Sequence, residues 1–294
     1  MSWSGSAGET ATYWVYRGLA WLAGRLPTAL GRRVFMGLGS AAHALMPQVR
    51  STVATNQARV LGREPGDPLV ASSTRAAFRL YARYWFDTFD AIGWSDERVN
   101  EAFRWENLEL FLGPLEAGTG AIVVVPHFGN WDLAGRAMAA RGMPVLSVAE
   151  RLKPERLFEL FLEHRRALRI EIVALDDKRV GRALMQAISA NRIVALVCDR
   201  DLTGRGAPVE MFGATRTMPL GPAMLALSTG APLVAAAVHT TPQGWRCTLS
   251  SVDAPRSGNR AADAAAITEA IAAEFERIIS TDPADWHLFQ PGWE

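Results

Sequence analysis

Short apolar runs alternate with stretches of helical periodicity from about residue 120 to the end of the chain. The runs are continuous, as in strands that are buried on both faces. They lie at residues 121–125, 145–149, 170–175, 193–198, 233–239 and 247–252. The helical stretches between and after them lie at residues 132–142, 154–168, 180–191, 219–230 and 260–281. This alternation predicts an α/β fold with a mostly parallel central sheet flanked by helices.

The first third of the chain has apolar residues at helical spacing and no strand-like run. Residues 12–46 predict two helices broken near Pro27, and residues 49–61 and 68–92 predict two more. We therefore expect a helical N-terminal subregion over residues 11–95.

Residues 1–10 are small and polar, and we expect them to be disordered. We expect residues 11–294 to form a single domain, in which residues 100–294 are the α/β core. The first predicted helix mixes Trp14 and Trp21 with arginines, which is typical of the headgroup region of a bilayer. The same side chains would also suit a helix that packs on the core.

Composition excludes several classes of protein. The chain has 294 residues, 49% of them hydrophobic and 21% charged, with a formal net charge of +1, so no basic field points to nucleic acid. The two cysteines, Cys198 and Cys247, lie in apolar runs and suggest neither a disulfide scaffold nor a zinc site. The apolar segment over residues 12–24 is interrupted by Arg17 and is too short to span a bilayer. We expect no bound metal and at most a protein that lies on a membrane surface.

The sharpest candidate for chemistry is the segment VVVPHFGNWDLAG, in which His127 follows an apolar strand directly. Ligands of open α/β sheets bind beyond the carboxyl ends of the strands. Asp132, at the start of the next helix, would hold one ring nitrogen of His127 and leave the other as a general base. Backbone amides around Gly129 and Asn130 would stabilise an oxyanion. The alternative is a buried structural histidine.

A second candidate is the segment VALVCDRDLTGRG, where another apolar strand ends in charged residues. Asp199 and Asp201 are two positions apart and share a face of an extended backbone. One of them would touch His127 if the two strands are neighbours; a metal-binding pair and a solvated loop are equally open interpretations. Arg200, between them, is a candidate substrate contact.

Further along the chain, Glu150 follows a strand and Arg165 lies late in the next helix. Arginines at the edge of a site bind the phosphates of a nucleotide thioester or a phospholipid head, although charges at a helix end are often only solvated. Met211, Phe212 and Met218 would shape an acyl pocket or pack in the core.

The sequence HFGNWD resembles the signature of the bacterial lysophospholipid acyltransferase superfamily, which is a histidine followed after four residues by an acid. The ordered set PHFGNWD, AERLKPERLF, DRDLTGRG, VEMFGATRTMPLGPAMLAL and WHLFQPGW is similar to the lipid A biosynthesis acyltransferases, and within them to the actinobacterial phosphatidylinositol mannoside branch. The resemblance implies a glycerol-3-phosphate acyltransferase-like fold, with His127 as the base and Asp132 as the signature acid. It also implies that Glu150 and Arg165 are charged active-site residues and that Asp201 contacts the histidine.

The resemblance further implies an O-acyltransferase that moves a long-chain acyl group, such as palmitoyl, from acyl-CoA to a mannose hydroxyl of phosphatidylinositol mannoside. Such an enzyme works peripherally on the cytoplasmic face of the inner membrane, with acyl-CoA, a glycolipid and the membrane surface as partners and no tightly bound cofactor. No G-x-S-x-G elbow is present, so we expect no acyl-enzyme.

Two other classes of protein remain open from the sequence. One is a metal-dependent phosphoesterase that uses His127, Asp132, Asp199 and Asp201, and the other is a non-catalytic peripheral lipid-binding protein.

Overall fold

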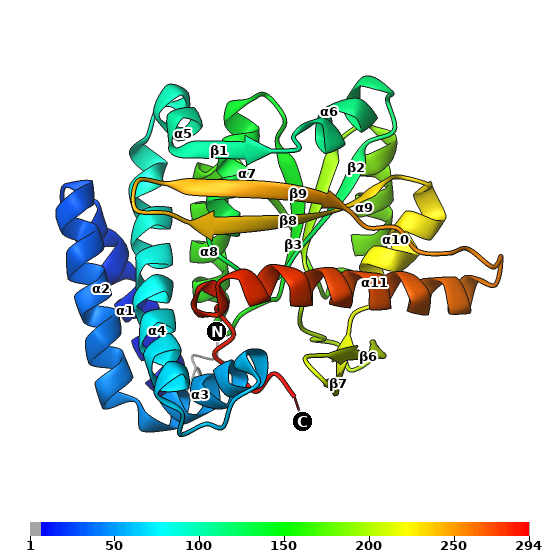
Figure 1. The fold of residues 1–294 in the computed structure, drawn as a ribbon. Helices are drawn as coiled ribbons and strands as arrows, with labels where there is room; N and C mark the ends of the chain where they lie inside the picture. The colour runs from blue at the N-terminus through cyan, green and yellow to red at the C-terminus, as the bar shows by residue number, and fades with distance from the viewer. Residues whose placement is uncertain (1–6, 294) are drawn as a thin grey trace.

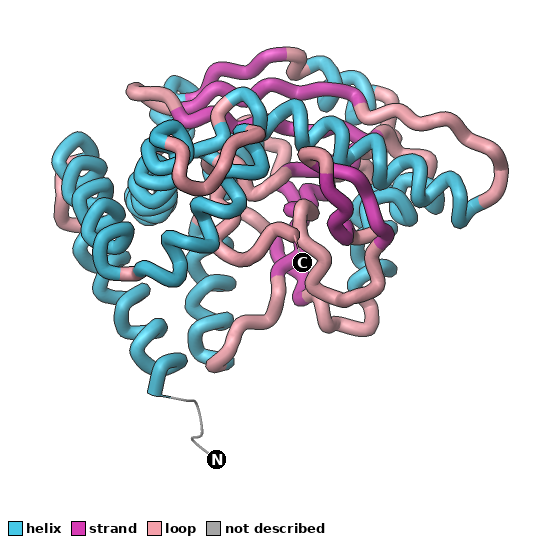
Figure 2. The backbone as a smooth tube through the Cα atoms, turned by 60° about the horizontal axis from the view of Figure 1, so that its bottom comes forward, coloured by secondary structure: helices cyan, strands magenta, loops and turns pink. Residues whose placement is uncertain are grey.

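The computed structural model describes residues 7–293, and its centre is a seven-stranded sheet (Figures 1 and 2). The strands are β1 (Phe103–Glu106), β2 (Ala121–Val125), β3 (Val145–Ala149), β4 (Glu171–Ala174), β5 (Ile193–Val197), β8 (Leu233–Thr240) and β9 (Trp245–Ser251). Their order across the sheet is β1-β9-β8-β2-β5-β3-β4. All pairs are parallel except β8 with β9. The predicted α/β fold with a mostly parallel sheet is confirmed.

Helices cover both faces of this sheet, because each continuous apolar strand presents hydrophobic side chains to both sides. One face packs against residues of α5 (Asp96–Ala102), α6 (Glu109–Glu116) and α7 (Trp131–Ala140). The other face packs against residues of α9 (Val180–Ser189), α10 (Gly221–Thr229) and α11 (Arg260–Thr281). All five residues of β2 are buried, so this strand lies at the centre of the core.

The predicted helical N-terminal region is present and stands beside the sheet as a group, coloured blue to cyan in Figure 1. Its helices are α1 (Ala7–Ala23), α2 (Thr28–Leu45), α3 (Pro47–Leu61) and α4 (Pro68–Asp90). The backbones of α2 and α4 approach closely at Gly39, where an added Cβ would lie 2.4 Å from the carbonyl oxygen of Phe78. Of the residues expected to be disordered, 1–6 lie outside the described residues, and α1 begins at Ala7.

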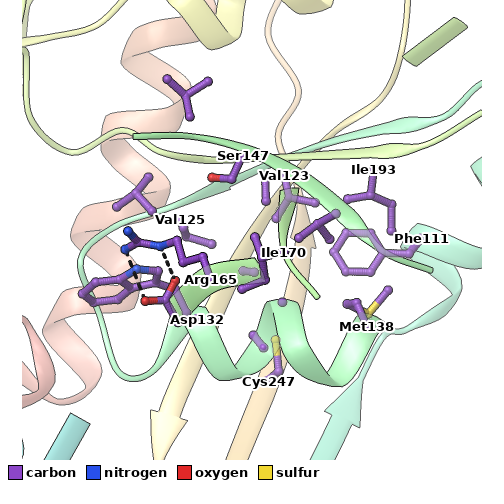
Figure 3. Close-up of a pocket in the computed structure, with 18 of the residues that line it drawn as sticks. Phe111, Val123, Val125, Asp132, Met138, Ser147, Arg165, Ile170, Ile193 and Cys247 are labelled. Atoms are coloured by element: carbon purple, nitrogen blue, oxygen red, sulfur yellow. Dashed lines mark hydrogen bonds and ion pairs between the residues drawn. The ribbon is translucent and has the colours of Figure 1, made fainter. Parts of the chain in front are cut away.

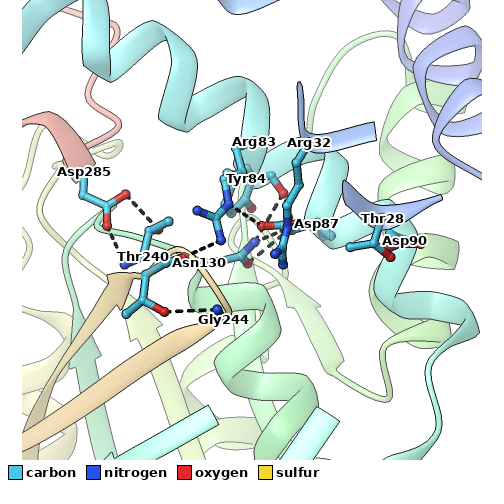
Figure 4. A network of polar contacts seen from close by, with 12 residues as sticks. Thr28, Arg32, Arg83, Tyr84, Asp87, Asp90, Asn130, Thr240, Gly244 and Asp285 are labelled. Atoms are coloured by element: carbon cyan, nitrogen blue, oxygen red, sulfur yellow. Dashed lines mark hydrogen bonds and ion pairs between the residues drawn. The ribbon is translucent and has the colours of Figure 1, made fainter. Parts of the chain in front are cut away.

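A buried ion network ties these helices to the sheet (Figure 4). The Asp87 carboxylate on α4 accepts from the guanidinium of Arg32 on α2 at 2.6 Å and from that of Arg83 at 3.0 Å. Arg83 also donates to the carbonyl of Thr241, in the turn after β8, at 2.7 Å. Burial raises the pKa of Asp87 against the opposing effect of the two arginines. The helical region is therefore held to the core by buried charges that are neutralised by their partners.

Several short elements were not predicted. They are β1, α5, α6, and a hairpin of β6 (Ala207–Met211) and β7 (Ala214–Met218). Side chains alternate between buried and exposed along both hairpin strands, and Phe212 and Gly213 turn the chain with positive φ. The sequence did not reveal this hairpin, because two short strands outside the main sheet carry little apolar periodicity. Helix α8 (Glu155–Ala167), which was predicted, carries Arg165 toward the carboxyl ends of the strands.

Candidate active site

Strand register brings His127 and Asp199 together. Strands β2 and β5 are parallel neighbours in which Val125 is paired with Val197, so the positions two residues further on face each other. His127 Nδ1 lies 2.5 Å from Asp199 Oδ1. Because a carboxylate only accepts hydrogen bonds, the proton is on Nδ1 and the lone pair is on Nε2. The side chain of His127 is 26% exposed, which leaves the ring reachable.

The Asp199 carboxylate is fully buried and held by three donors. Oδ1 accepts from the imidazole, and Oδ2 accepts from the backbone N–H of His127 at 3.0 Å and the indole N–H of Trp286 at 2.8 Å. Arg216 donates to the carbonyl oxygen of Asp199 at 2.5 Å. Burial would raise the pKa of Asp199, but the charge and hydrogen bonds of His127, helped by Trp286 and Arg216, hold it well below the usual range. Asp199 is therefore ionised and orients the imidazole.

Asp132 does not contact His127, which corrects the expectation from its place in the sequence. Its carboxylate accepts from Arg165 Nε at 3.1 Å and from the Tyr84 hydroxyl at 2.7 Å. Burial opposes ionisation, and the arginine and tyrosine lower the pKa of Asp132 below its usual value. The side chain lies in the first turn of α7 and points to α4 and α8, away from the imidazole. Asp132 and Arg165, predicted separately, form one ion pair.

Asp201 does not reach His127 either. Its carboxylate accepts from the backbone N–H of Thr203 at 2.9 Å and of Gly206 at 2.7 Å, and so organises the loop that follows β5. Burial opposes these hydrogen bonds, but together they lower the pKa of Asp201. The same loop holds Arg200.

Glu150, Arg200 and Asp201 meet at the rim of one groove, which we call the outer groove. It lies between α9 and α10, has about 380 Å³ open to water, and is lined in its apolar part by Leu184, Met185, Leu202, Met224 and Leu225. Met185, Leu202 and Met224 are among the large hydrophobic side chains most exposed to solvent. Two residues predicted as substrate contacts, Glu150 and Arg200, therefore share one apolar groove with Asp201, which was predicted to contact His127.

Gly129 and Asn130 form hydrogen bonds with backbone groups around them. Gly129 has φ of +60°, and an added Cβ would lie 1.4 Å from the carbonyl oxygen of Val238. Its N–H donates to the carbonyl of Asp285 at 2.8 Å, so it does not face a substrate. The Asn130 side chain is buried, accepts from Leu133 N–H at the start of α7, and donates to the carbonyl of Tyr84. This corrects the expectation that the Gly129 amide stabilises an oxyanion.

A narrow apolar cavity, the inner cavity, lies on the α7 side of the sheet (Figure 3). Val123 and Val125 line it, and side chains alternate along a strand, so the next position on that face is His127. The cavity has about 80 Å³ open to water and is lined also by Phe111, Trp131, Met138, Val145, Ser147, Ile170, Ile193, Ala195, Val197 and Cys247. Trp131 packs edge-on against the imidazole with ring centroids 5.2 Å apart, and the Asp132–Arg165 pair lines the same end.

Other sequence candidates prove to be structural. Met211 and Met218 are fully buried core residues, and Phe212 packs against the core. His287 is buried beside Tyr81 and Tyr84 and keeps a neutral ring, since burial, together with His127, lowers its pKa to about 3.

Trp286 and Tyr84 are neighbours of the site that were not predicted from the sequence. Tyr84 lies in an aromatic stripe that also suits a core, and Trp286 comes from the far end of the chain. The choice of Asp199 over Asp201 depends on the register of β2 against β5, which the two segments do not encode on their own.

Two features are absent from residues 7–293. No helix in this part of the chain is both long and apolar enough to cross a bilayer. In the same residues, no three histidine, cysteine, aspartate or glutamate side chains are grouped as metal ligands would be.

A histidine–carboxylate pair at the carboxyl edge of a parallel sheet, separated by Trp131 from an apolar cavity, suits an enzyme that acts on a lipid chain. Residues 1–294 match the family described as bacterial lipid A biosynthesis acyltransferase. The chain belongs to this family and is an acyltransferase, which confirms the family that its motifs resemble.

Its similar curated relatives are phosphatidylinositol mannoside acyltransferases of two mycobacteria. The protein of Mycolicibacterium smegmatis is 36% identical over 270 residues, which cover 91% of this chain and 86% of the relative. That of Mycobacterium tuberculosis strain H37Rv is 36% identical over 304 aligned residues, which cover 98% of this chain and 90% of the relative.

Proposed function

We propose that the chain transfers a long-chain acyl group, such as palmitoyl, from acyl-CoA to a mannose hydroxyl of a phosphatidylinositol mannoside, with neutral His127 as the general base. The observation that carries this proposal is the 2.5 Å contact between His127 Nδ1 and the buried Asp199 carboxylate. It leaves Nε2 as the basic atom of a partly exposed ring, which packs against Trp131 at the wall of an apolar cavity. The names of the mycobacterial relatives support the choice of acceptor.

In the proposed reaction, Nε2 of His127 takes the proton of the acceptor hydroxyl while its oxygen attacks the thioester carbonyl carbon. The carbon–sulfur bond breaks, and the leaving thiolate takes the proton back from the imidazolium. Asp199 stabilises the imidazolium between these steps, and a base placed in this way contributes about 10²–10⁴-fold to the rate. Cys198 is a poor alternative nucleophile, since burial and the nearby Asp199 raise the pKa of its thiol well above the usual value.

The two cavities suggest a separate binding place for each substrate. The inner cavity suits the acyl chain, because it is apolar and narrow and is lined by Trp131, which packs against the imidazole. The rim of the outer groove suits the acceptor headgroup, because Glu150, Arg200 and Asp201 offer hydrogen-bonding groups for sugar hydroxyls. Val148 and Val197 line both cavities, so the two binding places would adjoin.

Contact with a membrane surface is part of the proposal. On α1, Trp14 is 58% and Trp21 is 59% exposed, and Arg25 stacks over Trp21 at 3.9 Å. Replacing both tryptophans by serine should reduce sedimentation with vesicles of acidic phospholipids. Equal sedimentation of the double variant and the wild type would remove α1 as the contact.

The test of the reaction is to incubate the purified protein with palmitoyl-CoA and phosphatidylinositol mannoside, and to follow free thiol and product mass. His127→Ala should lower the rate by at least about 100-fold with little change in melting temperature. His43→Ala is the matched control, since that ring lies on α2 against Phe78 and does not contact Asp199. If His127→Ala keeps more than about a tenth of the wild-type rate, His127 is not the base.

The metal-dependent phosphoesterase is less well supported by the side chains it needs. Among the described residues, Asp132 is committed to Arg165 and Tyr84, and Asp201 to loop amides, so neither joins His127 and Asp199. Thiol release that survives a chelator, with no phosphate released, would favour acyl transfer.

A further inference from the structure

The segment that follows α11 is hydrogen-bonded to both His127 and Asp199, the two members of the proposed catalytic dyad. The N–H of His287 donates to the carbonyl of His127 at 2.7 Å, and the carbonyl of Asp285 accepts from the N–H of Gly129 at 2.8 Å. Between these two backbone contacts, the indole N–H of Trp286 donates to Oδ2 of Asp199 at 2.8 Å. Trp286 is therefore the one side chain of this segment bonded to the carboxylate that pairs with the base.

We propose that Trp286 is a positioning residue for acyl transfer, whose indole N–H holds the Asp199 carboxylate so that Oδ1 stays on Nδ1 of His127. The proposal rests on the proposed function, because it has a meaning only if His127 is the base. It adds a residue that acts through Asp199 and touches neither substrate.

The two oxygens of the Asp199 carboxylate have different hydrogen-bond partners. Oδ1 faces the imidazole, whereas Oδ2 is occupied by two N–H groups, one from the backbone of His127 and one from Trp286. Rotating the carboxylate would break all three hydrogen bonds of a fully buried group, where an unpaired charge is costly. An indole N–H donates only, so it favours the ionised carboxylate and has no basic lone pair to take up the proton.

The indole itself has little freedom to move. Trp286 is 1% exposed, its backbone pairs with that of Phe128, and its ring lies 6.0 Å from that of Trp293 in an edge-on contact. The charged and titratable groups that face Asp199 are His127, Arg216 from β7, the buried thiol of Cys198 and, behind His127, the neutral ring of His287. None of these could replace the indole N–H on Oδ2 without the chain moving, since each is already bonded or is held by the buried core.

Trp286→Phe tests the proposal, because it keeps an aromatic ring and removes the donor. We expect kcat with palmitoyl-CoA and phosphatidylinositol mannoside to fall roughly 10- to 100-fold, as for the loss of a hydrogen bond to a charged group, with KM unchanged for both substrates. The acid limb of kcat/KM should move to higher pH, since Asp199 with one donor fewer holds the imidazolium more tightly.

Trp293→Phe is the matched control. It removes an indole N–H that donates to the carbonyl of Met211 at 3.2 Å, in contact with Trp286 but not with Asp199. This variant should keep the wild-type kcat and pH profile. A wild-type kcat in Trp286→Phe, an equal loss in both variants, or an unmoved acid limb would overturn the proposal.

A second measurement uses the wild-type protein, in case Trp286→Phe does not fold. With ¹⁵N-labelled tryptophan, the indole proton resonance of Trp286 should shift with the midpoint of the acid limb, and that of Trp293 should stay in place. A stationary Trp286 resonance would overturn the proposal. The two hypotheses fail separately: an active His127→Ala refutes the base, whereas an inactive His127→Ala with a fully active Trp286→Phe refutes only the role of Trp286.

Discussion

Three aspartates were candidates from the sequence for contact with His127, and each has different surroundings in the fold. Asp132 pairs with Arg165 and Tyr84, Asp201 accepts loop amides, and Asp199 binds the imidazole. The sequence left open whether Asp199 or Asp201 would touch the histidine, because both point to the same face of an extended chain. The register of β2 against β5 decides for Asp199, and no local pattern encodes that register.

At the same scale, we predict different consequences for two conservative substitutions. Asp199→Asn should lower kcat by about 10³–10⁴-fold, because an amide in this place favours the wrong tautomer of the imidazole. Asp201→Asn should lower kcat less than about tenfold, because it affects the loop and the binding of the acceptor but leaves the contact between His127 and Asp199 intact. The check is steady-state kinetics of both variants with the same acyl donor and acceptor. The reverse order of effects would make Asp201 the partner of His127.

Along strand β5, alternate side chains point to opposite faces of the sheet. Ile193, Ala195 and Val197 line the inner cavity, and the residues between them belong to the core on the opposite face. The sequence predicted a strand buried on both faces and placed it within one residue of its observed end. It did not reveal that one face borders a cavity, since that depends on how closely α7 and α8 pack over the strand.

The position of Ala195 in the middle of this cavity leads to a prediction about chain length. A strand rises about 3.3 Å per residue, so the cavity side of β5 from Ile193 to Val197 spans about 13 Å, enough for a large part of an extended acyl chain. Ala195→Met should lower kcat/KM for palmitoyl-CoA at least about tenfold relative to shorter donors, because each excluded methylene forfeits about 0.8 kcal/mol.

The matched control for this prediction is Met185→Phe, which enlarges a side chain of the outer groove. It should leave the chain-length preference as in the wild type. The measurement compares kcat/KM over a series of saturated acyl-CoA donors. An unchanged preference in Ala195→Met, or a change in Met185→Phe, would place the acyl chain elsewhere.

Several ionisable side chains are buried in the folded molecule, and they make its stability depend on pH. His164 on α8 and His287 are buried, and burial lowers their pKa values from 6.5 to about 4 and about 3. Between those values and 6.5 the unfolded chain binds protons that the folded chain does not, so stability falls as the pH drops below about 6.5. Asp285 acts in the opposite sense, since burial raises its pKa from 3.8 to about 7 and the folded state retains that proton.

We therefore predict that two substitutions change the pH dependence of stability in opposite directions. His164→Phe should flatten the loss of unfolding free energy between pH 7 and pH 5, and Asp285→Asn should steepen it. Each group changes the slope by up to about 1.4 kcal/mol per pH unit. Urea unfolding at several pH values measures both slopes, and a slope unchanged by either substitution would contradict the assigned burial effect.

The sequence by itself determined the class of fold, most of the element boundaries, the position of His127 after a strand, and the acyltransferase family. These follow from periodicity and from ordered motifs, which are local properties of the chain. Only the tertiary structure decided that Asp199 rather than Asp132 or Asp201 holds the imidazole, that Glu150, Arg200 and Asp201 share one groove, and that Trp286 lies behind the dyad. Those contacts join segments up to 87 residues apart, and they depend on strand register and helix packing, which arise when the whole chain buries its apolar surface.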